Sequence, residues 1–173
     1  MMDNRYPIGE FHLPKKINKN DIELWISEIE EAPKKLNEAV RGLTKEQLES
    51  SYRQGGWRLY QVVHHLADAH MNGYIRIKTG LTENQSTIKT YNQESWAELE
   101  DNNLSIQVSL NLFSSVHKRL TFLLKSLNED ELKRTINHPE SGLLTIEKLI
   151  AIYAWHGRHH IAHITSLRKQ KGW

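Results

Sequence analysis

The sequence has 173 residues, with 23 basic and 21 acidic side chains and a net charge of +2 at pH 7. This length suits one domain with a sizeable core, so we expect residues 1–173 to form a single domain, and the near-neutral charge argues against a nucleic-acid binder. The chain contains no cysteine, which excludes disulfides and any thiolate nucleophile or thiolate metal ligand from the protein itself.

Four long segments show the spacing of apolar residues that is typical of amphipathic helices. They span residues 20–43, 57–80, 105–127 and 145–170. We expect the first to be capped at Asn20 or Asp21, and we expect Pro33 to kink it or divide it in two. A short helix capped at Thr44, with Gln47 three residues later, should follow.

The polar connection between the second and third segments is about twenty residues long, and we expect one short helix within it around Glu94–Glu100. A link of that length can cross the end of a bundle. Asn128 with Glu131 has the spacing of a capping box, and Thr145 is suited to cap the last segment. No strand alternation is sustained enough for a sheet. The sequence therefore predicts an all-α fold, a four-helix bundle.

The N-terminal stretch MMDNRYPIGEF lacks the apolar core of a signal peptide, and no apolar stretch approaches membrane-spanning length. The absence of cysteine fits a reducing compartment. We therefore expect a cytoplasmic protein with no membrane partner.

The stretch WHGRHHIAHI, residues 155–164, places four of the ten histidines within eight positions. On a helical wheel of about 100° per residue with His156 at zero, the apolar face centres near +20°. His160 at about +40° and His163 at about −20° share that face with His156, whereas His159 lies on its flank near −60°. The rings of this stretch are therefore expected to face the core.

His156 and His160 are the best-centred pair on that face, and side chains four residues apart on a helix can bind one ion. The pairs His159–His163 and His160–His163 remain open alternatives. Neutral imidazole is a common metal ligand, and two core rings without a shared ion would leave nitrogens that are hard to satisfy. A third ligand from another helix would make the prediction much stronger.

The second segment offers three histidines, His64, His65 and His70. His65 lies on a polar face with Asn72 and Arg76, about 110° from the apolar face of the same helix. Such a face can line a cleft beside the core, where a catalytic ligand should stand, or it can be exposed to solvent. His70 is directed more towards the core. Spacing alone does not decide among the three rings.

The stretches GGWRLYQVVHHLADAH, YIRIK and HPESGLLTIEKLIAIYAWHGRHHIAHI, with the opening YPIGEF, resemble the DinB/YfiT-like family of metal-binding four-helix bundles. The resemblance covers almost the whole chain and is closest to the YfiT branch, described as metal-dependent hydrolases and linked to bacillithiol S-transferases. It implies an up-down-down-up bundle with a long second connection, and a homodimer.

The family's metal site combines one histidine of the second bundle helix with an HxxxH pair of the last. Carried over position by position, the resemblance implies that His65, His156 and His160 bind a divalent metal. Three neutral nitrogen ligands leave coordination positions open for water or substrate, as in catalytic sites. Zinc suits this ligand set, and nickel is compatible with it.

Two reactions fit such a site, and both take a small-molecule substrate. The metal can activate water for hydrolysis, or it can bind a low-molecular-weight thiol as the thiolate that attacks an electrophile. The alternative is a non-catalytic metal-binding or stress-related interaction module. An HExxH protease is excluded because Gly157 follows His156, and no GxSxG motif is present.

Three further residues are candidates for roles beside the metal. Arg76 can bind the carboxylate of an anionic cosubstrate, and Asn72 shares its face of the helix. Asp68, one turn beyond His65, can orient the second nitrogen of a ligand. For each of them, a solvated helix surface is the simpler alternative.

Overall fold

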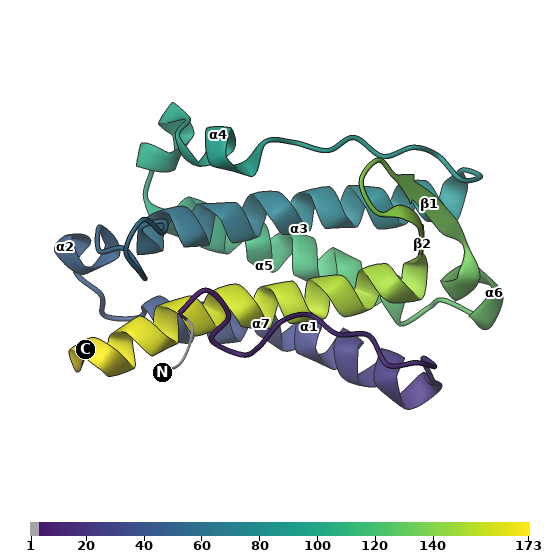
Figure 1. Ribbon diagram of the computed structural model, residues 1–173, viewed down its shortest axis with the longest axis horizontal. Helices are drawn as coiled ribbons and strands as arrows, with labels where there is room; N and C mark the ends of the chain where they lie inside the picture. Colours follow the sequence, from purple (N-terminus) through teal and green to yellow (C-terminus); the bar gives the residue numbers. More distant parts are fainter. Residues whose placement is uncertain (1–3) are drawn as a thin grey trace.

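The computed structural model describes residues 4–173, so the first three residues of the expected domain lie outside the described part of the chain. Four long helices dominate the fold (Figure 1). They are α1 (Lys19–Val40), α3 (Leu59–Thr82), α5 (Ile106–Leu124) and α7 (Ile146–Lys171). Each one lies where the sequence predicts a long helix, and no helix among the described residues is apolar over a bilayer-spanning length.

The four helices form an up-down-down-up bundle, as expected. Helix α1 packs against α5 and α7, and α3 packs against the same two helices, so α1 and α3 lie diagonally opposite. Figure 1 shows α3 and α5 running in one direction and α1 and α7 in the other. Two consecutive helices can be parallel here because the connection over residues 83–105 returns along the length of the bundle.

Helix α1 differs from the prediction at two points. Its N-cap is Asn18, and Asp21 is the third residue of a capping box in which each side chain accepts the other's backbone N–H. Of the two outcomes expected at Pro33, the division is wrong, because α1 is one helix through that residue, and the kink stays a prediction. Proline removes the N–H that would bond the carbonyl four residues earlier, that of Ile29. That carbonyl instead accepts a hydrogen bond from His117, 2.6 Å away.

The remaining elements are short. They are α2 (Lys45–Leu48), α4 (Gln93–Ala97), η1 (Glu100–Asn103), α6 (Glu129–Lys133), β1 (Thr135–His138) and β2 (Gly142–Thr145). The caps expected at Thr44, Asn128 and Thr145 are all present. The antiparallel β1–β2 hairpin was not predicted, because strands of four residues are too short to show a sustained alternation.

The apolar core consists of two clusters separated along the bundle by histidines. On α3, His70 lies between Ala67 of one cluster and Ile77 of the other. On α5, His117 lies in the same way between Phe113 and Leu120. Helix α7 repeats the pattern, since His156 and His160 follow one cluster and precede the other. The fold thus places a layer of imidazoles in the middle of a packed interior.

Helices α3 and α7 approach each other closely at Gly73, where a Cβ atom would lie 2.4 Å from Cζ of Tyr153. We expect Gly73→Ala to lower the free energy of unfolding by about 1–3 kcal/mol, because the Tyr153 ring must shift. Gly157→Ala is the matched control, since its nearest neighbour would be 3.5 Å away, an ordinary contact. Urea unfolding of the two variants measures the difference. Equal stability of both would contradict the close approach.

Candidate metal centre

The structure brings together the rings of His65 on α3 and of His156 and His160 on α7. The ring centroids are 5.2 Å apart for His65 and His156, 4.7 Å for His65 and His160, and 4.5 Å for the α7 pair. One nitrogen from each ring lies within 4.8 Å of the others. Residues 91 positions apart in the chain therefore present three imidazole donors to one point.

The spacing of the nitrogens fits a bound cation. Nε2 of His65 and Nε2 of His156 are 3.2 Å apart. Two imidazole ligands on a tetrahedral zinc, with bonds of about 2.0–2.1 Å, place their nitrogens about 3.3 Å apart. The residues present thus fit a divalent metal with little movement of either ring.

The three rings lie at the boundary between core and solvent. His65 is buried, with 5% of its surface exposed, so the interpretation of its polar face as solvent-exposed is wrong. His156 and His160 are only partly buried and keep an edge towards solvent. This arrangement combines ligands fixed by the core with access for a water or a small substrate, as an open catalytic site requires.

Burial keeps these histidines neutral. It lowers the pKa of His65 to about 4, with the nearby rings of His159 and His163 acting in the same direction. It also holds the pKa values of His156 and His160 well below the usual value of 6.5. Because only neutral imidazole offers a lone pair to a metal, all three rings are ready to act as ligands at pH 7.

Trp57 packs against two of the three rings, those of His65 and His160. Its ring centroid lies 4.5 Å from that of His65 and 6.3 Å from that of His160. The indole N–H donates to Oε2 of Glu94 at 2.9 Å, which fixes the ring from the long connection. Trp155 instead stacks on His159, with centroids 4.4 Å apart. Both tryptophans therefore pack against histidine rings, but of the two it is Trp57 that packs against rings of the candidate site.

The other histidines near the three rings differ in their neighbours. Nδ1 of His64 lies 2.7 Å from the hydroxyl of Ser109 on α5, away from the three rings. His70 is fully buried and lies 3.2 Å from Nδ1 of His156. A second group that could hold a metal consists of His159, His160 and His163, so it shares His160 with the first.

Asp68, Asn72 and Arg76 follow His65 at intervals of three or four residues and therefore share a face of α3. Burial, aided by Asp101, raises the pKa of Asp68 to about 6. The Asn72 amide donates to the Asp68 carbonyl at 2.9 Å.

Arg76 is half-buried and donates to the hydroxyl of Tyr153 at 3.1 Å and to the Lys89 carbonyl at 3.4 Å. Its buried Nε has no hydrogen-bond partner among the described residues. The guanidinium is thus held between α7 and the long connection.

A model of the DinB superfamily matches residues 28–164, which includes all three rings. The chain belongs to the DinB superfamily. Among curated members, a protein of Oceanobacillus iheyensis is 52% identical over 99% of this chain and its own full length. A Bacillus cereus member is 51% identical over the full length of both chains. Both carry the name "putative metal-dependent hydrolase".

Two solved structures are similar to this chain. YfiT from Bacillus subtilis, described as "a probable metal-dependent hydrolase with an unusual four-helix bundle topology", superposes with a TM-score of 0.95 at 44% identity over 99% of both chains. The mycothiol-dependent maleylpyruvate isomerase superposes with a TM-score of 0.67 at 10% identity, over 83% of this chain and 60% of its own. At that identity the second likeness shows a shared fold alone.

Sequence reasoning missed His117 and gave His70 only as a candidate directed towards the core; both lie behind the three rings. His117 occupies an apolar face of α5, between Phe113 four residues before and Leu120 three residues after. A histidine in such a place is a detectable signal. The spacing of residues along the helix cannot show which groups the two nitrogens of His117 contact.

Proposed function

We propose that the protein is a hydrolase that binds one divalent cation, zinc, through His65, His156 and His160. The main support for this proposal is the convergence of three neutral imidazoles from α3 and α7, with two of their nitrogens 3.2 Å apart. When bound, such a cation lowers the pKa of a coordinated water towards about 7 and polarises a carbonyl or similar group. The names of the relatives support this reaction class.

Different residues of the chain have different roles around the three histidines. The three histidines would hold the ion, and Trp57 packs against the rings of His65 and His160. Arg76 provides a fixed positive charge on the same face of α3, which suits a substrate that carries a carboxylate or another anion. Asp68, with a pKa of about 6, is suited to accept a proton near neutral pH.

A second candidate is transfer of a low-molecular-weight thiol, of the bacillithiol type, to a small electrophile. The lack of cysteine in the chain is consistent with this reaction, because the sulfur would then come from a cosubstrate that the cation would bind as thiolate. The Arg76 guanidinium would bind an anionic group of that cosubstrate.

One experiment separates the two reactions. The zinc-loaded protein is assayed against a panel of small esters and amides, with and without an added low-molecular-weight thiol, and against electrophiles with the thiol. We expect ester or amide turnover without thiol, abolished by a chelator and restored by zinc. Turnover of electrophiles that consumes thiol would instead assign the transferase. If the protein binds zinc but shows no turnover in either panel, both proposed reactions are contradicted. A non-catalytic metal-binding module would then remain.

A further inference from the structure

Behind the metal centre, four groups form a continuous row of hydrogen bonds across the core. The Ile29 carbonyl lies 2.6 Å from Nδ1 of His117, Nε2 of His117 lies 2.9 Å from Nδ1 of His70, and Nε2 of His70 lies 3.2 Å from Nδ1 of His156. We call this row the histidine relay. It joins α1, α5, α3 and α7 in turn, so every long helix contributes one member.

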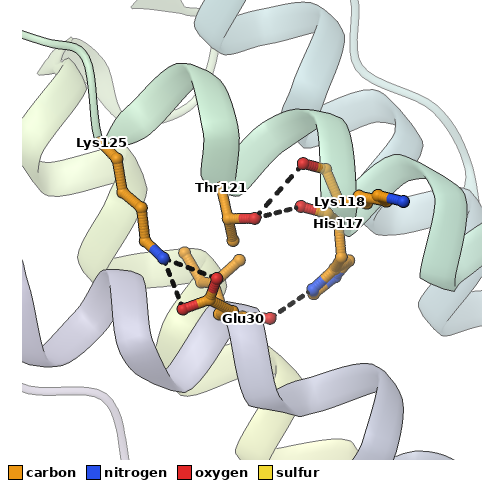
Figure 2. A network of polar contacts seen from close by, with 6 residues as sticks. Glu30, His117, Lys118, Thr121 and Lys125 are labelled. Atoms are coloured by element: carbon orange, nitrogen blue, oxygen red, sulfur yellow. Dashed lines mark hydrogen bonds and ion pairs between the residues drawn. The ribbon is translucent and has the colours of Figure 1, made fainter.

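The far end of the histidine relay is fixed by Pro33. Because proline has no N–H, the Ile29 carbonyl one turn earlier lacks its usual helical donor. His117 supplies that donor from α5, and Figure 2 shows its ring reaching towards α1 beside the ion pair of Glu30 and Lys125. A buried carbonyl without a partner would be costly, so the ring is held in this orientation.

The direction of every hydrogen bond in the relay follows from that carbonyl. A carbonyl oxygen only accepts, so the proton of His117 is on Nδ1. A neutral imidazole has one N–H and one lone pair; the remaining nitrogen of His117 therefore accepts from Nδ1–H of His70. By the same rule Nε2 of His70 accepts from Nδ1–H of His156. Burial supports the neutral form of His117, since it lowers the pKa of that ring to about 4.

We infer that His70 and His117 are positioning residues which fix His156 in the tautomer whose Nε2 lone pair faces the metal. This inference rests on the proposed function in taking His156 as a ligand. Metal-bound histidines commonly donate their other N–H to a carboxylate or a carbonyl. Here a neutral imidazole receives it, so the relay orients His156 without placing negative charge beside the cation.

His160 is oriented by a shorter row of the same kind. Nε2 of His163 lies 3.1 Å from the Arg5 carbonyl, so that nitrogen carries the proton of His163. Its Nδ1 therefore accepts from Nδ1–H of His160, 3.3 Å away, and Nε2 of His160 keeps its lone pair. His163 is thus a positioning residue and not a ligand of a second ion. This assignment predicts one zinc per chain from His65, His156 and His160, and none from the group that contains His159 and His163.

The decisive comparison is between His117→Leu and His117→Gln. Leucine removes the acceptor for His70, whereas the glutamine side-chain oxygen can accept from the same N–H. We expect His117→Leu to weaken zinc binding by about 10–100-fold and His117→Gln to restore it close to the wild-type value. Competition with a chromophoric chelator measures the affinity. His64→Leu is the matched control, because it removes a buried histidine of α3 that bonds Ser109 of α5 and takes no part in the relay, and zinc affinity should be unchanged.

A second measurement tests the relay without relying on metal. Nitrogen NMR of the histidine side chains in the metal-free protein reports which ring nitrogen carries the proton. We expect Nδ1–H for His117, His70 and His156 in the wild type, and for His70 and His156 in His117→Gln. This NMR measurement still tests the relay if His117→Leu does not fold.

Three results would overturn the inference: a proton on Nε2 of His70 or His156 in the metal-free wild type, a folded His117→Leu with wild-type affinity, or an equal loss of affinity in His64→Leu. Two zinc ions per chain would overturn the assignment of His163. If the wild type binds no zinc at all, the proposed function fails, while the NMR result still decides whether the relay exists.

Discussion

Replacing His160 with alanine is expected to weaken zinc binding by more than about 100-fold and to abolish metal-dependent turnover. The loss of a residue that only supports a ligand already costs about 10–100-fold in metal affinity, and removing a ligand itself leaves two imidazoles to hold the ion. Elemental analysis after dialysis and a chelator competition measure the effect. Circular dichroism checks that the variant remains helical.

His159→Ala is the matched control for this substitution. His159 is the preceding residue of α7, is buried, and stacks on Trp155. If His65, His156 and His160 bind the ion, His159→Ala keeps wild-type zinc affinity. If the ion belongs to the other group, which includes His159, both alanine variants lose it. Retention of zinc by His160→Ala at wild-type affinity would contradict both assignments.

The metal-free protein is expected to lose stability steeply as the pH falls from 6.5 towards 4. Burial lowers the pKa of His65 and of His117 from 6.5 to about 4. Between these values the unfolded chain binds protons that the folded chain does not, so stability falls as the pH falls. Each of the two groups costs about 2 kcal/mol at pH 5, against a typical total of about 5–15 kcal/mol.

Other titrating groups modify this dependence without reversing it. Seven further histidines also have lowered pKa values, and they act in the same direction. Asp68 acts in the opposite direction, because its raised pKa of about 6 makes its ionised form less favourable in the folded state as the pH rises. Burial also raises the pKa of Glu28, so two carboxyls oppose nine imidazoles, and the net effect of acid is destabilising.

Urea unfolding in the presence of a chelator, at pH 7.5 and at pH 5.5, measures this loss. The chelator ensures that the change reports protons and not the release of metal. His117→Gln removes one buried titrating ring and should show a smaller pH dependence than the wild type. Equal stability at the two pH values, or a gain in acid, would refute the prediction.

The bundle was predictable because local signals agree along the chain. The apolar spacing places all four long helices, and the caps at Thr44, Asn128 and Thr145 are present as expected. The misplaced N-cap of α1 reflects a choice among neighbouring polar residues, of which Asn18 forms the cap. Helix α1 is not divided at Pro33, although proline lacks the N–H that would bond the Ile29 carbonyl. His117 of another helix supplies that hydrogen bond instead.

The metal centre was predictable only in part. Helical geometry identifies His156 and His160 as a pair, whereas His65 came from the family resemblance and was not chosen by spacing. The structure brings these three rings together. Their metal-binding role, the roles of Asp68, Asn72 and Arg76, the homodimer and the cytoplasmic location stay predictions.

The sequence by itself determined the helices, their amphipathic faces and the inward direction of the last histidine pair, because these depend on spacings of three and four residues. Only the tertiary structure decided which nitrogen of each ring faces a neighbour and which is left for a metal. That choice depends on contacts between residues such as Ile29, His117 and His70. These residues lie on three different helices and are 41 to 88 positions apart in the chain. Packing four helices around one layer of imidazoles fixes those contacts, and no local pattern encodes them.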